Sequence, residues 1–211
     1  QEPFHISKKK VTYSLIFIVS IIHLLNGFAV WIRYELESSK LLNAYVSLFS
    51  VSSEGKIPTW YSACTLLFCA VLLTLIAVSK RRNRDAFLKH WVGLAIIFAF
   101  MSLDEATSIH EMTNRPLQRI FDTSGPFLFA WVIPGIVAVF IVGIIYIKFL
   151  RGLPGRTRNL FLIAGSTYIF GVLGMELIGS NYASDHGRDL GYGVIASIEE
   201  VFEMSGIVEW H

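Results

Sequence analysis

The sequence predicts an all-α membrane protein, a bundle of five to six transmembrane helices with a short interfacial helix. The first observation behind this fold class is composition: of 211 residues, 54% are hydrophobic and only 16% are charged, whereas a soluble domain has roughly 25% charged residues. The second is that apolar runs of about 20 residues, the length that crosses a bilayer, recur along the chain. We therefore expect a single transmembrane domain over residues 1–211, surrounded by the lipid bilayer.

The first two predicted spans flank a polar stretch. The first span follows three consecutive lysines, and the polar stretch after it contains LLNAYVSLF, which is typical of a short helix at the membrane interface. The second span opens with Pro58-Thr59-Trp60; proline suits the first turn of a helix and tryptophan suits the headgroup zone. By the same rule we interpret four tryptophans as interfacial belt residues: Trp31, Trp60, Trp91 and Trp131.

Four more spans follow, separated by polar breaks. The third is expected to continue as one helix through SLDEATSIHE, until NRPLQRIFDTSGP breaks it. RGLPGRTRN separates the fourth from the fifth, and NYASDHGRDLGYG separates the fifth from the sixth, which ends at His211 and is either incomplete or just long enough to cross. The six expected spans are about 11–32, 58–79, 91–111, 127–150, 160–180 and 194–211.

Basic residues in the connecting segments predict the orientation. In this topology twelve lysines and arginines fall on the side of the N-terminus and six on the other, and the basic side of a multi-pass protein is the cytoplasmic one. We therefore expect a bacterial inner-membrane protein with a cytoplasmic N-terminus.

Acidic residues from three spans are expected to meet at one depth. Asp104 lies 13 residues after Trp91, roughly 20 Å along the third helix, in the outer third of the bilayer. Glu176 lies at a similar height on the fifth span. The sixth span returns from outside and carries Glu199, Glu200 and Glu203 in its first turns.

Helical spacing refines this cluster. In one continuous helix Asp104, Ser108 and Glu111 share a face, while His110 points elsewhere. His23 on the first span and His186 in the loop above are expected at a similar depth.

An ionised carboxylate at the bilayer centre costs roughly 2.5–3.5 kcal/mol, so several together need bound cations, retained protons or nearby bases. Arg115, Arg119, Arg188 and the histidines are too few to supply all of that charge. Carboxylates and imidazoles suit iron, zinc or manganese, and bundle metal sites are built from inward-facing acids. The sequence therefore predicts a divalent metal site, in which a metal-activated water or oxygen species would act on a lipid-like or small apolar substrate. The candidate ligands are Asp104, His110, Glu111, Glu176, Glu199, Glu200 and Glu203.

Other interpretations remain open. The acids also suit a hydrogen-bonded network of partly protonated groups, or an ion or proton pathway. The chain is also a candidate for a non-catalytic accessory subunit of a larger membrane complex. A net charge of only +2 argues against nucleic acid as a partner, and no phosphate loop or GxGxxG motif indicates a nucleotide.

Four motifs occur in order: SSEGKIPTWYS, MSLDEATSIHE, RGLPGRTRNLFLIAG and SIEEVFEMSG. Together they resemble a group of uncharacterised bacterial polytopic inner-membrane proteins with LDE…HE and EE…EM-G motifs, over most of the chain from about Leu48. The resemblance implies that the acids, His110 and also Glu105 belong to one shared polar pattern, and it implies no activity.

Overall fold

The computed structural model describes residues 8–36, 39–50 and 56–208, and within those residues every regular element is helical. Four helical segments there are long and apolar enough to cross a membrane, and a bent pair forms a fifth candidate span. The expected all-α membrane fold is confirmed. The elements are α1 (Lys8–Glu35), α2 (Lys40–Phe49), α3 (Ile57–Arg82), α4 (Leu88–Thr107), α5 (Ile109–Phe121), η1 (Gly125–Phe127), α6 (Val132–Gly152), α7 (Gly155–Ile169), η2 (Phe170–Met175), α8 (Glu176–His186) and α9 (Leu190–Val208).

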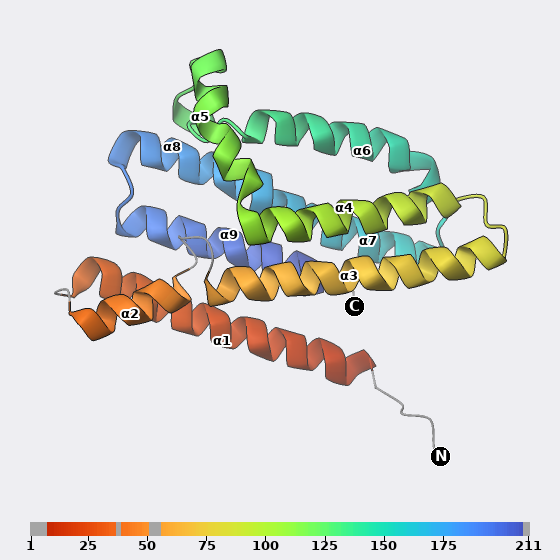
Figure 1. Cartoon of the computed structure of the whole chain (residues 1–211), viewed down its shortest axis with the longest axis horizontal. Coiled ribbons are helices and arrows are strands. Elements are labelled where there is room, and N and C mark those ends of the chain that lie inside the picture. The colour runs from red at the N-terminus through yellow and green to blue at the C-terminus, as the bar shows by residue number, and fades with distance from the viewer. Residues whose placement is uncertain (1–7, 37–38, 51–55, 209–211) are drawn as a thin grey trace.

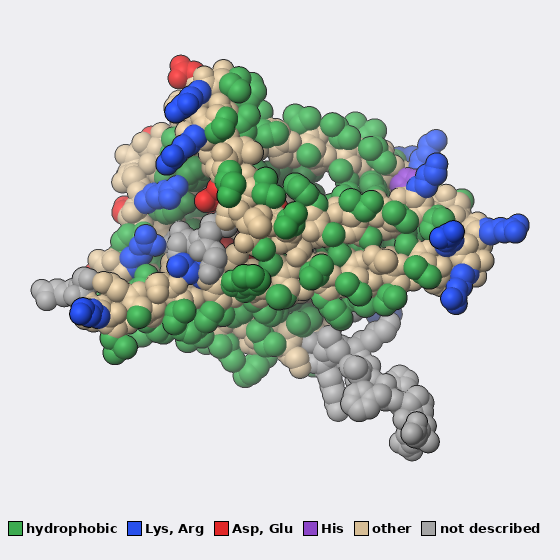
Figure 2. Space-filling model, viewed as in Figure 1, with side chains coloured by type: hydrophobic (Ala, Val, Ile, Leu, Met, Phe, Trp, Pro, Cys, Tyr) green, Lys and Arg blue, Asp and Glu red, His purple; other side chains and the backbone are tan. Residues whose placement is uncertain are grey.

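The long helices lie side by side, and two of their turns gather at one end of the bundle (Figure 1). The α3–α4 turn and the α6–α7 turn meet at the end where α1 begins, while α2, α5 and the α8–α9 turn lie at the other. Lysines and arginines lie at both ends, and a broad apolar surface lies between them (Figure 2). This is the pattern of a multi-pass membrane protein.

The prediction of one continuous helix over 91–111 is wrong. Helix α4 ends at Thr107, Ser108 adopts a left-handed conformation (φ 56°, ψ 39°), and α5 leaves at an angle of 79°. Ser108 therefore redirects the chain, and α5 lies across the end of the bundle. As a result Asp104 and Glu111 do not share one helix face.

The fifth predicted span lies inside a longer segment. α7, η2 and α8 form one run over residues 155–186, in which η2 has π-helical geometry. π-Helical turns within α-helices are frequent at functional sites, and this one lies directly before Glu176.

Helix α9 corresponds to the predicted sixth span, of which residues 209–211 lie outside the described part. Helix α9 carries three carboxylates, so it is not among the helices that are apolar enough to count as candidate spans. It packs against α1, α7 and η2. At Gly206 an added Cβ would lie 2.7 Å from the backbone nitrogen of Tyr168, so glycine allows α7 and α9 to approach closely.

The buried core lies toward the end of the bundle that carries the α3–α4 turn. Helices α3 and α4 pack against each other along their length. Trp91 is buried there against Phe149, so its interpretation as a belt residue is wrong, whereas Trp31 and Trp60 are exposed as expected. Ser102 donates a hydrogen bond of 2.7 Å to the carbonyl of Ala63 and so fixes the acidic end of α4 against α3.

Candidate functional site

A cavity of about 1110 Å³ lies between α4, α6, α7, η2 and α9. One part of it is lined by acidic side chains, and the rest is mostly apolar. All seven candidate ligands line it: Asp104, His110, Glu111, Glu176, Glu199, Glu200 and Glu203. The structure therefore brings together the acids of α4–α5, α8 and α9, as the helix heights predicted, although the helix break changes how they face one another.

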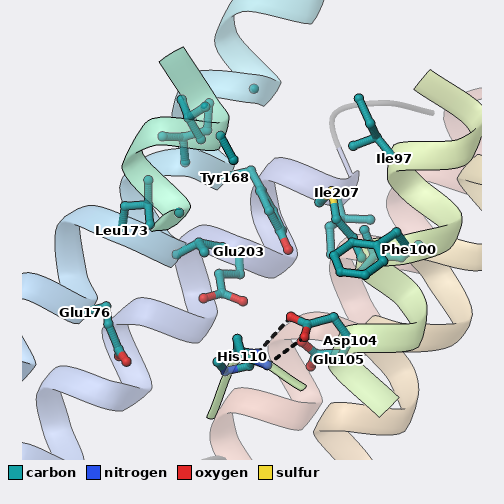
Figure 3. A pocket seen from close by; sticks show the side chains of 18 of the residues that line it. Ile97, Phe100, Asp104, Glu105, His110, Tyr168, Leu173, Glu176, Glu203 and Ile207 are labelled. Atoms are coloured by element: carbon teal, nitrogen blue, oxygen red, sulfur yellow. Dashed lines mark hydrogen bonds and ion pairs between the residues drawn. The ribbon is translucent and has the colours of Figure 1, made fainter. Parts of the chain in front are cut away.

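The break between α4 and α5 forms a pair between Asp104 and His110 (Figure 3). One oxygen of Asp104 accepts the backbone N–H of His110 at 2.9 Å, and the other lies 2.8 Å from Nδ1 of the same residue. The carboxylate thus caps the first turn of α5 and orients its imidazole. Both side chains are about a quarter exposed. The expectation that His110 points away from Asp104 is wrong.

Trp131 connects this pair to Glu176. Its indole Nε1–H donates a hydrogen bond of 2.9 Å to Oε1 of Glu176, and its ring contacts the imidazole of His110, with ring centroids 4.7 Å apart. The carboxyl groups of Glu176 and Glu199 also hydrogen-bond to each other. A hydrogen bond between two carboxyl groups requires a proton on one of them. Trp131 is thus a cavity residue and not the predicted belt residue.

Tyr168 was missed by sequence reasoning. Its hydroxyl points toward the acidic side chains, and Glu203 points into the same space from α9 (Figure 3). The approach of η2 to α9 sets this arrangement, since a Cβ at Gly171 would lie 3.0 Å from the backbone nitrogen of Glu203. The glycine-rich sequence of the fifth span indicated close packing, but nothing in it singled out Tyr168.

Two arginines line the cavity, Arg33 and Arg188. Arg188 was among the expected bases, and its guanidinium lies over the rings of Phe129 and Tyr192 at 5.3 and 5.5 Å. Arg33 was not among the expected bases.

Several other expected members lie elsewhere. Arg115 and Arg119 are exposed on α5 and are not among the lining residues. His186 is exposed and stacks on Tyr182, and His23 lies 2.8 Å from the carbonyl of Val19 beside a second pocket between α1 and α9.

The donor chemistry of the cavity suits a divalent metal, but its geometry does not form a ready site. Among the residues that the structure describes, no three His, Cys, Asp or Glu side chains are grouped so as to hold an ion. Metal binding by the seven candidates therefore stays a prediction.

Comparison with known proteins gives a family but no activity. No curated protein and no solved structure matches the chain. A family model described as a domain of unknown function, DUF8692, matches residues 3–211. This is in line with the resemblance to an uncharacterised family, and the chain belongs to the DUF8692 family.

Proposed function

We propose that this protein is a membrane enzyme that acts on a lipid-like substrate by proton transfer through the Asp104–His110 pair. The observation that carries the proposal is a cavity in which this pair lies among acidic side chains while the remaining lining is mostly apolar. Such a cavity suits a molecule with a polar reacting end and an apolar body.

The pair has the geometry of an oriented acid–base catalyst. Because Asp104 accepts a hydrogen bond from Nδ1–H, the proton of a neutral imidazole is held there and Nε2 becomes its basic nitrogen. The second bond, from the backbone N–H of His110, prevents the carboxylate from rotating. Nε2 would accept a proton from water or from a substrate hydroxyl and later return it to the leaving group. A positioned base of this kind contributes about 10²–10⁴-fold to a rate.

Neighbouring groups support the same role. Contact with Trp131 restricts the imidazole plane, and Tyr168 offers a hydroxyl donor at the junction of the acidic and apolar linings. In the proposed bacterial inner membrane, with a cytoplasmic N-terminus, the positive-inside rule places this site toward the outer face.

A proton or ion pathway suits the lining less well. Beyond the acids, toward the end that carries the α3–α4 turn, the wall is apolar except for Tyr146. It includes Val142, Phe149, Leu150 and Phe161. A conducting path needs polar groups along its length.

A resident metal ion is a second candidate function because carboxylate and imidazole donors line the cavity. Elemental analysis of the purified protein tests it: stoichiometric iron, zinc or manganese, lost in Glu203→Gln, supports it, and metal-free protein with the same thermal stability counts against it.

The enzyme proposal is tested with the full chain in nanodiscs that contain a bacterial lipid extract, followed by mass spectrometry of the lipids. We expect the wild type to convert at least one lipid species and His110→Gln to lower that rate by about 10²-fold or more. His186→Gln is the matched control, since His186 is exposed and does not line the cavity. Equal conversion by His110→Gln would refute the role of the pair, and no conversion of any lipid by the wild type would refute the enzyme.

A further inference from the structure

The cavity has a side opening as well as an acidic end. Helix α6 contacts α4 near the α3–α4 turn, where Tyr146 and Phe149 pack on His90 and Trp91. Away from that turn it approaches α7 and η2 more closely than α4. It has the smallest share of buried residues among the four apolar span-length helices in the described part of the chain. The space-filling view shows a gap between α4 and α6 (Figure 2). Helix α6 is long and apolar enough to cross a membrane, and α4 is so together with α5. We therefore expect this gap to face the lipid.

The residues at this opening are apolar. Ile96 and Phe100 of α4 line the cavity and are also strongly exposed. Across the gap, α6 contributes Val139, Val142 and Gly143. At Gly143 an added Cβ would meet nothing within 4 Å, so the opening there is unfilled. An alkyl chain lying in this gap would contact hydrocarbon on both walls.

The charges at the acidic end of the cavity are unbalanced. Among the described residues the lining includes seven acids, against two arginines and His110. Even when one carboxyl group is counted as protonated and His110 as charged, six carboxylates face three positive groups. Away from bulk water such an excess is costly, so a positive group on the ligand would be bound favourably.

We propose that the cavity binds an amphiphile with a positively charged head group, which lies among the carboxylates while its chain passes between α4 and α6 into the bilayer. This inference rests on the proposed function and names the substrate class of the same site. We propose an organic cation and not a metal ion, because an apolar opening would contact an alkyl chain but offers no ligand to a metal ion.

The test is equilibrium binding of radiolabelled dodecylamine to the full chain in phosphatidylcholine nanodiscs, with empty nanodiscs for the background. Unlabelled dodecylamine, dodecanol and dodecyl phosphate, which share one chain, are the competitors. We expect dodecylamine to compete best, with the alcohol and the phosphate needing at least about tenfold more, the equivalent of 1.4 kcal/mol. Equal or better competition by the alcohol or the phosphate overturns the positive head group and leaves the enzyme proposal standing. Absence of specific dodecylamine binding overturns the inference, whereas the enzyme proposal is decided separately by the lipid-conversion assay.

Two variants test where the head group and the chain of the ligand bind. Glu203→Gln removes a carboxylate from the acidic end and should weaken dodecylamine binding about tenfold while leaving competition by dodecanol unchanged. Gly143→Phe fills the opening and should weaken binding of every chain, whereas Gly27→Phe, at a glycine of α1 with equally open surroundings that does not line the cavity, should not. Unchanged binding in Gly143→Phe, with the variant folded, overturns the proposed path of the chain.

Discussion

Replacing Asp104 separates its two roles, that of a helix cap and that of an orienting partner. Asp104→Ala removes the acceptor for both the backbone N–H and the imidazole of His110. A hydrogen bond to a charged group contributes about 1.5–3 kcal/mol and a cap about 1 kcal/mol. Because the two effects overlap and the side chain is partly exposed, we expect a loss of about 2–4 kcal/mol in unfolding free energy, or roughly 5–15 °C in Tm.

Asp104→Asn should behave differently. Its carbonyl oxygen still accepts the backbone N–H of His110, so the loss of stability should be only about 1 kcal/mol. Its amide group, however, donates to Nδ1 and so moves the imidazole proton to Nε2. In a serine protease the corresponding exchange lowers kcat on the order of 10⁴-fold, and we expect a similar loss of any activity that depends on His110.

The assays are thermal unfolding in detergent and ¹⁵N chemical shifts of the histidine side chains. The His110 signals are assigned by their absence in His110→Gln. Asp185→Asn, which changes an exposed acid outside the cavity, is the control and should alter neither property. The reasoning is refuted if Asp104→Ala is as stable as the wild type, or if His110 keeps its tautomer in Asp104→Asn.

Two further predictions concern packing and pH. Gly206→Ala should lower the unfolding free energy by about 1–3 kcal/mol, because its Cβ would meet the Tyr168 backbone at 2.7 Å, whereas Gly165→Ala, with nothing within 4 Å, should not; equal unfolding curves for the two variants would contradict the packing. In the α3–α4 turn, a hydrogen bond of 2.8 Å from the Lys80 side chain lowers the pKa of Asp85 below its ordinary value of 3.8. The pair therefore stabilises the fold above about pH 4 and loses that effect as the pH falls through the lowered pKa. Asp85→Asn should thus be less stable than the wild type at pH 7, with the difference disappearing near pH 2, and a difference that persists in acid would be inconsistent with this pair.

Sequence reasoning located the acids because helix height depends only on residue count. Each turn adds a fixed rise, so the convergence of Asp104, Glu176 and Glu203 followed from the positions of the spans. The cytoplasmic side of the N-terminus depends on the basic turns alone and stays a prediction.

The details of the site depended on features that have no regular sequence signal. Serine in the left-handed conformation is uncommon, so nothing in SLDEATSIHE indicated the bend at Ser108 or the pairing of Asp104 with His110. Trp131 fits an interfacial belt by composition, and only the path of the chain after α5 brings it to Glu176. The opening beside α6 depends on how far two apolar helices stand apart, which their sequences do not specify.

The central claim is that the acids of α4 and α9 face one another across one cavity. It is tested most directly with dibromobimane, which becomes fluorescent when it joins two neighbouring thiols. The background is a chain in which both native cysteines are replaced by alanine. We predict fluorescent cross-linking in the double variant Glu105→Cys/Glu203→Cys, since both positions line the cavity, and none in Glu105→Cys/Ile144→Cys, whose second position is exposed on α6 and outside the lining. Failure of the first pair to cross-link, with both thiols reactive, would contradict the claim.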